Sequence, residues 1–179
     1  TMKAANRRLR RHAVMKLEDL DAQWRPKGRA LPVVDQVLPA LDTILAAAPV
    51  RHMVTPGGFS MSVGTSSCGP LGWITDRHGY RYSRVDPLSD LPWPAMPEVF
   101  SALAQSAAAQ AGFTDFNADS CLINRYAVGA RMSLHRDADE QDFRQPIVSV
   151  SLGLPVVFLF GGLQRSERAQ RVPLAHGDV

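Results

Sequence analysis

A histidine and a carboxylate stand two residues apart in Ser133-Leu134-His135-Arg136-Asp137-Ala138-Asp139-Glu140, directly after a predicted strand. Side chains two apart on a strand point to the same face. An imidazole and a carboxylate on one face can supply two of the three ligands of a 2-His-1-carboxylate facial triad, which leaves open positions on Fe(II). The competing interpretation is a solvated strand end, since 5 histidines and 17 acidic residues in 179 make a chance H-x-D unsurprising.

Length and composition predict one domain that is soluble and not a membrane protein. A single core serves about 100 to 200 residues, and 45% of the 179 residues are hydrophobic. The mean hydropathy is -0.11. Cys68 and Cys121 are too few for a disulfide framework, and no apolar signal-peptide core follows the first basic residues. We therefore expect a reducing, cytoplasmic location and a monomer.

The amino-terminal end is basic. The formal net charge is +3, the sequence pI is about 9.2, and four arginines cluster at Arg7, Arg8, Arg10 and Arg11. Such a cluster favours a polyanionic partner, but a solvated basic terminus explains it equally well. Residues 1–33 show no clear periodicity, so we predict a basic arm or linker there and a folded domain over residues 34–179.

Two helices and several short strands are predicted. Apolar residues recur at spacings of three and four over Val34–Ala48, and again from Pro97 to Gly112, where the glycine ends the pattern. Two β-prone runs flank Pro56–Gly58 in Met53–Gly64, and Gly72–Thr75 can pair with Tyr80–Ser83. The later strands are predicted at Ser120–Tyr126, Arg131–Leu134, Ile147–Leu152, Val156–Phe160 and Arg171–Leu174. This pattern indicates an α+β chain that is mainly β, with a sandwich or jelly roll.

Seven segments match one family in order. They are Met53–Gly58, Leu71–Trp73, Trp93–Pro97, Leu122–Tyr126, Ser133–Asp137, Ser149–Leu154 and Phe160–Gly162. The chain resembles the AlkB-type nucleic-acid dealkylating dioxygenases from about Arg51 to Val179. The resemblance implies a double-stranded β-helix, which is a jelly roll, with two supporting helices and a β-hairpin lid that recognises the nucleotide.

The resemblance also implies a cofactor site. His135 and Asp137 resemble two metal ligands for Fe(II), and Asn124 and Tyr126 resemble the side chains that hydrogen-bond the co-substrate 2-oxoglutarate; dioxygen is the other co-substrate. Amide and phenol donors suit an anionic co-substrate. The alternative for Asn124 and Tyr126 is that they are alternate side chains of an ordinary strand.

Further positions resemble the family's substrate-binding residues. Thr55, Phe59, Met61 and Ser62 resemble the lid, and Trp73 and Tyr80 resemble residues that stack on the base and contact the backbone. Trp73 and Tyr80 are otherwise explained as core aromatics. Asp139 resembles a catalytic carboxylate that faces the exocyclic amine of the base, and Arg165 a phosphate contact. Without the resemblance, both are solvated surface charges.

The implied reaction is an oxidative dealkylation, in which an alkyl carbon on a base nitrogen is hydroxylated and leaves as an aldehyde. The expected substrates are 1-methyladenine and 3-methylcytosine in DNA, most simply single-stranded, with RNA as an alternative. A base methylated on its pairing edge is cationic, which favours a nearby carboxylate and an aromatic face.

The end of the chain departs from the resemblance. Where the family continues into strands that carry a second histidine ligand and two arginines, this sequence ends at Leu174-Ala175-His176-Gly177-Asp178-Val179. His176 falls before the family's ligand position and is not assigned to the metal. We therefore expect an incomplete chain with little dealkylation activity. Two alternatives stay open, a member of the same fold that binds nucleic acid without turnover and a structural jelly-roll protein.

Overall fold

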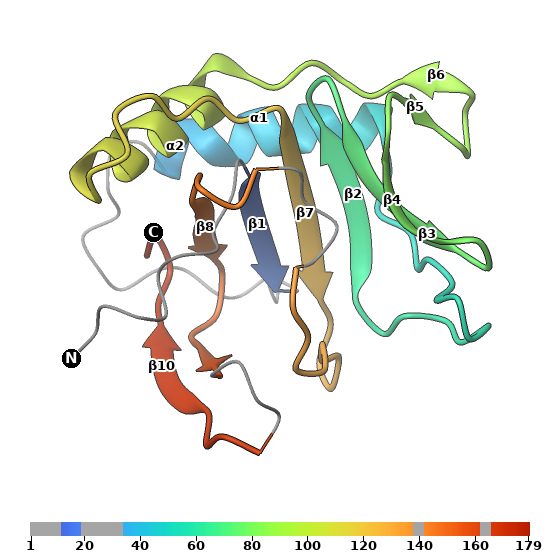
Figure 1. The fold of residues 1–179 in the computed structure, drawn as a ribbon. Helices are drawn as coiled ribbons and strands as arrows, with labels where there is room; N and C mark the ends of the chain where they lie inside the picture. Colours follow the sequence, from blue (N-terminus) through green and yellow to red (C-terminus); the bar gives the residue numbers. More distant parts are fainter. Residues whose placement is uncertain (1–11, 19–33, 138–141, 162–165) are drawn as a thin grey trace.

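The computed structural model describes residues 12–18, 34–137, 142–161 and 166–179 (Figure 1). Asp139 and Arg165 lie outside these residues. The elements are β1 (His12–Glu18), α1 (Val34–Ala47), β2 (Gly64–Cys68), β3 (Gly72–Asp76), β4 (Gly79–Ser83), β5 (Val85–Asp86), β6 (Leu91–Pro92), α2 (Glu98–Gln110), β7 (Ser120–Tyr126), β8 (Ile147–Leu152), β9 (Val156–Phe160) and β10 (Gln170–Leu174). None of the described helices is both long and apolar enough to cross a membrane.

Both predicted helices are confirmed, and their ends follow from local chemistry. α1 begins at Val34, so Pro39 is accommodated inside the helix rather than delaying its start. α2 ends at Gln110, and Gly112, two residues later, adopts a left-handed φ of 90°. The Gly112 amide donates to the Ala109 carbonyl at 3.0 Å, and the Phe113 amide donates to the Ala108 carbonyl at 2.9 Å. This pair of bonds is the Schellman termination, which a glycine permits without a Cβ clash.

The main sheet has four strands in the order β2-β7-β1-β8. β2 pairs with β7 antiparallel, whereas β1 pairs in parallel with both β7 and β8. The arm or linker predicted over residues 1–33 was therefore wrong for His12–Glu18, which forms a strand inside the sheet. Its sequence, HAVMKLE, mixes apolar residues with His12, Lys16 and Glu18 and shows no apolar alternation over its whole length.

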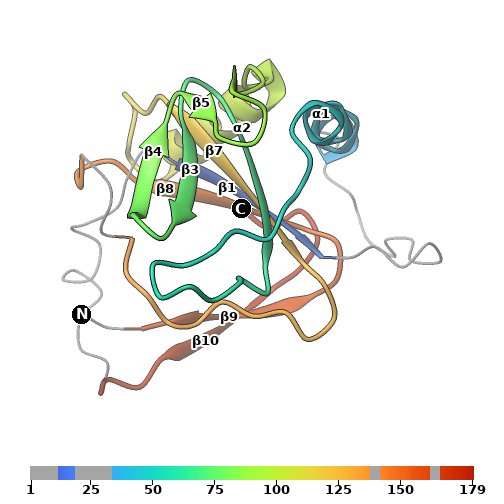
Figure 2. The same cartoon turned by 90° about the vertical axis from the view of Figure 1, so that its right-hand side faces the viewer.

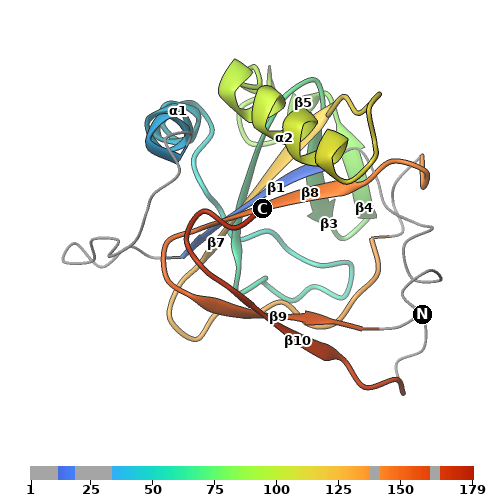
Figure 3. The ribbon, with the colours of Figure 1, turned by 90° about the vertical axis from the view of Figure 1, so that its left-hand side faces the viewer.

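The hydrophobic core lies between this sheet and the two helices. Figures 2 and 3 show α1 and α2 on one side of the sheet and the β9–β10 ribbon on the other. The residues at the centre of this core include Leu41, Phe100, Cys121, Ile123 and Val150, all at most 2% exposed. Along β7 and β8, the apolar side chains that face this core alternate with polar ones. The opposite face of the sheet is therefore more polar.

The second layer is the two-stranded ribbon in which β9 pairs with β10 antiparallel. Its apolar side chains are unusually exposed, including Val157, Phe158, Leu159, Phe160 and Val172 at 38% to 48%. A main sheet with helices outside and a ribbon opposite its inner face is consistent with a jelly roll. The strand predicted at Arg131–Leu134 was wrong, since these residues form a loop.

The segment between Met53 and Gly64 is a loop with hairpin-like bonding rather than a pair of named strands. Val54 and Ser60 form an antiparallel bridge. The Thr55 amide donates to the Phe59 carbonyl at 2.8 Å, and the Met61 amide donates to the Met53 carbonyl at 2.8 Å. We call residues 53–63 the recognition loop. The predicted turn at Pro56–Gly58 therefore exists, while a lid function stays a prediction.

A buried ion pair fixes the base of the recognition loop. Arg51 donates from Nη1 to Asp86 Oδ2 at 2.9 Å, and its Nη2 lies 2.6 Å from Oδ1. The guanidinium carbon also lies 5.1 Å from the centre of the Trp93 ring, a cation–π contact. Trp93 in turn donates from Nε1 to the Ser83 carbonyl. These contacts join the start of the loop to the β4–β6 region.

Candidate metal and co-substrate site

His135 and Asp137 lie in the loop that follows β7, and their side chains approach each other. His135 Nε2 is 3.4 Å from Asp137 Oδ1, and both side chains are about half exposed. Bonds from imidazole nitrogen and carboxylate oxygen to a divalent metal such as zinc are about 2.1 Å long. Two such atoms can therefore share one ion at any separation up to about 4.2 Å. The predicted proximity exists, although a loop and not a strand provides it.

The tautomer of His135 also suits a metal ligand. Its Nδ1 lies 2.7 Å from the carbonyl oxygen of Ser133. A carbonyl can only accept, so Nδ1 carries a hydrogen, which leaves Nε2 as the ring nitrogen that a metal ion would use. Metal-bound histidines commonly have their other ring nitrogen held in this way. The donor atoms of His135 and Asp137 therefore fit two ligands of one divalent cation.

A second histidine–aspartate pair shows why proximity alone does not define a metal site. His78 Nδ1 lies 3.3 Å from Asp76 Oδ1. Here Arg81 donates to both carboxylate oxygens of Asp76 at 2.9 and 2.6 Å. The Arg81 hydrogen bonds, with the backbone amide of His78, hold the pKa of Asp76 well below its usual range. The charge of Asp76 is already paired with a cation, so this turn does not need a metal.

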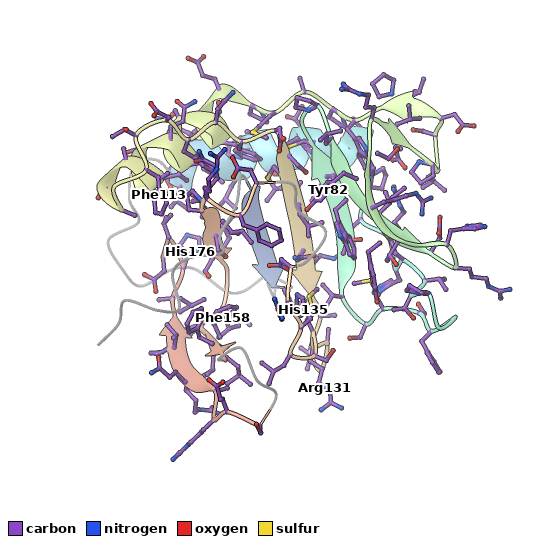
Figure 4. The ribbon with its side chains drawn as sticks, viewed as in Figure 1. Tyr82, Phe113, Arg131, His135, Phe158 and His176 are labelled. Carbon is purple, nitrogen blue, oxygen red and sulfur yellow. The ribbon has the colours of Figure 1, made fainter. Side chains whose placement is uncertain are left out.

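The third ligand is not found among the residues that the structure describes. No group of three or more His, Cys, Asp or Glu residues there could hold a metal ion. His176 accepts a hydrogen bond at Nδ1 from the backbone amide of Gly153 at 2.9 Å. Figure 4 shows His135 near the end of β7 and His176 apart from it, toward β8. His176 lies after β10, and its hydrogen bond to Gly153 holds the turn between β8 and β9.

Asn124 and Tyr126 lie on β7, on the face that points away from the helices. Their neighbours Cys121 and Ile123 point into the core, which fixes this assignment by alternation. Asn124 is 3% exposed. Its Oδ1 is buried with no hydrogen-bond partner among the described residues. An unpaired buried polar atom is costly. A carboxylate only accepts, so the amide of Asn124 would meet an anionic co-substrate with its N–H donors and not with Oδ1.

Sequence reasoning missed the serines on the same face. The side-chain oxygens that are buried and unpartnered within the described part of the chain include those of Ser67 on β2, Ser120 on β7, and Ser149 and Ser151 on β8. Alternation with Val148, Val150 and Leu152 in Ile147–Leu152 was the signal that could have identified the two β8 serines. Together with Asn124 they form what we call the polar face. Hydroxyl and amide donors there can bind carboxylate oxygens.

The predicted substrate residues of the recognition loop have different surroundings. Phe59 is 76% exposed at its tip. Thr55 Oγ1 accepts from the Phe59 amide at 3.2 Å, so this hydroxyl shapes the turn. Met61 packs on the small cluster formed by Ala48, Met53, Ile74 and Trp93. The Ser62 hydroxyl binds the backbone of Arg131. Thus Phe59 and Met61 offer apolar surface, while both hydroxyls are used within the protein.

Trp73 and Tyr80 meet on the β3–β4 hairpin. Their ring centroids are 5.7 Å apart and the rings are inclined by 19°, a stacked arrangement. Tyr80 is 47% exposed, and Trp73 packs against the same small cluster as Met61. The structure therefore brings Trp73, Tyr80 and Met61 into one region at the base of the recognition loop. Asp139 and Arg165 stay predictions, since both lie outside the described residues.

Comparisons with known proteins show the family of this chain. Residues 34–179 match the profile of the 2OG-Fe(II) oxygenase superfamily. Over 150 residues the chain is 54% identical to the Alpha-ketoglutarate-dependent dioxygenase AlkB of Escherichia coli (strain K12). The aligned region covers 84% of this chain and 69% of that protein. It is 32% identical over 109 residues to the Nucleic acid dioxygenase ALKBH1 of Homo sapiens, covering 61% of this chain and 28% of that protein.

A solved structure, that of OsALKBH1, has a similar fold. It superposes with a TM-score of 0.64 over 81% of this chain and 71% of that chain, at 23% sequence identity. An identity this low supports the fold alone. The family of the chain is shown by the sequence matches, because the family profile covers most of the chain. The chain therefore belongs to the 2OG-Fe(II) oxygenase superfamily and, within it, to the AlkB-type dioxygenases, whose cofactor is Fe(II) and whose co-substrates are 2-oxoglutarate and dioxygen.

Proposed function

We propose that this domain removes alkyl groups oxidatively from N-alkylated bases in nucleic acid. The proposed substrates are 1-methyladenine and 3-methylcytosine in DNA, most simply single-stranded, with RNA as the alternative. The proposed form is a cytoplasmic monomer. The human relative's description as a nucleic acid dioxygenase supports the substrate class. The 3.4 Å approach of His135 Nε2 to Asp137 Oδ1 is the observation that carries the chemistry.

The reaction balances without a further reductant. When bound, Fe(II) supplies the activation of dioxygen that couples oxidation of 2-oxoglutarate to hydroxylation of the alkyl carbon. One oxygen atom enters succinate as carbon dioxide leaves, and the other enters the alkyl C–H bond. The resulting hemiaminal breaks its C–N bond, which returns the base and releases an aldehyde. A methyl group leaves as formaldehyde.

The chain's own residues bind and orient the reactants. His135 and Asp137 hold the metal, while Asn124 and Tyr126 donate hydrogen bonds to 2-oxoglutarate; the serines of the polar face add donors nearby. Trp73 and Tyr80, on the β3–β4 hairpin, receive the base outside its stack, where an aromatic surface replaces the stacking that it lost. From the resemblance, we propose that Asp139 serves as the carboxylate for the exocyclic amine and Arg165 as a phosphate contact.

Product analysis tests this proposal directly. The protein is incubated with Fe(II), 2-oxoglutarate, dioxygen and a single-stranded oligonucleotide that contains 1-methyladenine. The expected result is equal release of formaldehyde and succinate, with no formaldehyde from the unmethylated oligonucleotide. Binding of the oligonucleotide without release of either product would indicate a nucleic-acid-binding protein of the same fold. Absence of both binding and turnover would favour a structural jelly-roll protein.

Trp73→Ala is expected to weaken binding of the methylated oligonucleotide by about 1 to 3 kcal/mol, the usual contribution of one stacked base. Trp73→Phe keeps an aromatic face and is the matched control, with most of the affinity retained. Fluorescence anisotropy with a labelled oligonucleotide measures both variants. Because Trp73 also packs on the small cluster, the Tm of each variant is recorded. An unchanged affinity in Trp73→Ala would remove this ring from the site.

Asn124→Ala is expected to raise the Kd for 2-oxoglutarate about tenfold, since a hydrogen bond to a charged group contributes roughly 1.5 to 3 kcal/mol and neighbouring donors compensate in part. Calorimetric titration in the presence of Mn²⁺, a redox-inactive substitute for Fe(II), gives the value. Asn117→Ala, in the exposed loop before β7, serves as the control. Equal affinities in both variants would place 2-oxoglutarate elsewhere.

A further inference from the structure

One hydroxyl group connects the recognition loop to the loop that carries the metal ligands. Ser62 Oγ donates to the Arg131 carbonyl at 2.9 Å. The same oxygen accepts from the Arg131 amide at 3.2 Å. A serine hydroxyl has one hydrogen and two lone pairs, so a single side chain can satisfy both backbone groups of one residue. These residues are 69 positions apart in the sequence.

The position of Arg131 makes this contact relevant to the metal site. After β7 the chain turns at Ala127–Ala130, where the Ala130 amide donates to the Ala127 carbonyl at 2.8 Å. Arg131 follows that turn, and His135 follows four residues later, close to Ser133, whose carbonyl orients its ring. Ser62 therefore holds the stretch between the β7 turn and the metal ligands. Figure 4 shows Arg131 at the tip of this loop, near the end of β7.

The other end of the contact lies in the segment proposed to grip the nucleotide. Met61 packs on the small apolar cluster, whereas the Ser62 side chain faces the backbone of Arg131. His52 donates from Nδ1 to the Met61 carbonyl at 2.9 Å, which fixes the backbone beside Ser62. A nucleotide that orders Phe59 and Met61 would thus also order the Ser62 hydroxyl.

We propose that Ser62 is a positioning residue that couples nucleotide binding to metal binding, a role that rests on the proposed function. Ordering either loop lowers the entropy cost of ordering the other, so each ligand raises the affinity for its partner. This coupling is reciprocal, because both ligands act on one equilibrium. The hydroxyl acts through Arg131 and touches neither the metal nor the base.

The test compares Ser62→Ala with Ser62→Thr, which keeps the hydroxyl, and with Ser60→Ala, which removes the neighbouring hydroxyl of the same loop. Mn²⁺ affinity is measured from the electron paramagnetic resonance signal of the free ion. The affinity for a 1-methyladenine oligonucleotide is measured with and without Mn²⁺. In the wild-type protein, Mn²⁺ is expected to tighten oligonucleotide binding at least about 5-fold, within the usual range of such coupling.

Ser62→Ala is expected to weaken Mn²⁺ binding by up to about tenfold, the lower end of the loss when a direct hydrogen-bonding partner of a metal ligand is removed, because Ser62 acts on the ligand loop only through Arg131. It is also expected to reduce the effect of Mn²⁺ on the oligonucleotide to nearly none. Ser62→Thr and Ser60→Ala should keep the wild-type coupling. Because Ser62 is exposed, Tm should shift by no more than about 4 °C. A merely structural serine would change Tm without changing the coupling.

Two results would overturn the inference. One of them leaves the proposed function intact, and the other rejects it as well. If the wild-type protein binds both ligands with coupling and Ser62→Ala keeps that coupling, the role of Ser62 is wrong while the proposed function stands. If the wild-type protein binds neither Mn²⁺ nor the methylated oligonucleotide, the proposed function fails together with the coupling.

Discussion

Replacing His135 or Asp137 with alanine is expected to lower the affinity for Fe(II) by at least about 100-fold, the upper end of what even outer hydrogen-bonding partners of a metal ligand contribute. Each substitution removes one donor atom from a pair that lies 3.4 Å apart. Both side chains are about half exposed, so the fold should persist. Anaerobic Fe(II) titration measures the affinity, and circular dichroism measures the retained structure.

The second histidine–aspartate pair gives the matched control for this experiment. His78→Ala removes an imidazole that also lies beside a carboxylate, at 3.3 Å from Asp76. Since Arg81 already neutralises Asp76, the Fe(II) affinity of His78→Ala should equal that of the wild-type protein. Equal losses in His78→Ala and His135→Ala would show that the assigned pair has no special role.

Asp86→Ala is expected to lower the free energy of unfolding by about 3 kcal/mol, because it leaves the Arg51 guanidinium buried without its counterion. Breaking a buried ion pair costs roughly 3 to 5 kcal/mol. The lower end applies here since the Arg51 side chain is 18% exposed, compared with 5% for Asp86. For a domain of this size the loss corresponds to a fall in Tm of roughly 6 to 12 °C. Thermal unfolding followed by circular dichroism provides the measurement.

A second substitution separates the orphaned charge from other effects of losing Asp86. In the double variant Arg51→Met with Asp86→Ala, no charge stays buried, and the methionine can pack on Trp93. The double variant should therefore recover part of the stability lost in Asp86→Ala. Asp115→Ala, in an exposed loop, is the control with little expected change. A Tm for Asp86→Ala equal to that of Asp115→Ala would contradict the ion-pair explanation.

Elements with strong local signals were predicted well from the sequence. β7, β8 and β9 have the predicted bounds, and α2 ends at Gln110, two residues before the predicted stop at Gly112. β2 was missed because Gly64–Cys68 has no apolar alternation, although every residue in it is buried. Arg131–Leu134 alternates like a strand but lies in a loop, where Ser62 satisfies the backbone of Arg131. Local periodicity cannot reveal a partner that is distant in sequence.

In the candidate site, too, local spacing was predictable from the sequence and contacts between distant groups were not. The spacing of His135 and Asp137 predicted that the two side chains would be close, and they are. It could not predict the hydrogen bond from His135 to Ser133 that sets the tautomer. The family resemblance placed both Thr55 and Ser62 among the substrate contacts. Their hydroxyls are used within the protein, which depends on backbone groups that only the folded structure places beside them.

The β9–β10 ribbon implies that local opening is unevenly distributed over this molecule. A two-stranded ribbon is marginally stable by itself in water, and Val157, Phe158, Leu159 and Phe160 are each at least 40% exposed. Little burial therefore opposes separation of these two strands, whereas opening β7 would expose Cys121 and Ile123, which are fully buried. The amide hydrogens of β9 and β10 should exchange with solvent through frequent local opening. Those of β7 should exchange only when the whole domain unfolds.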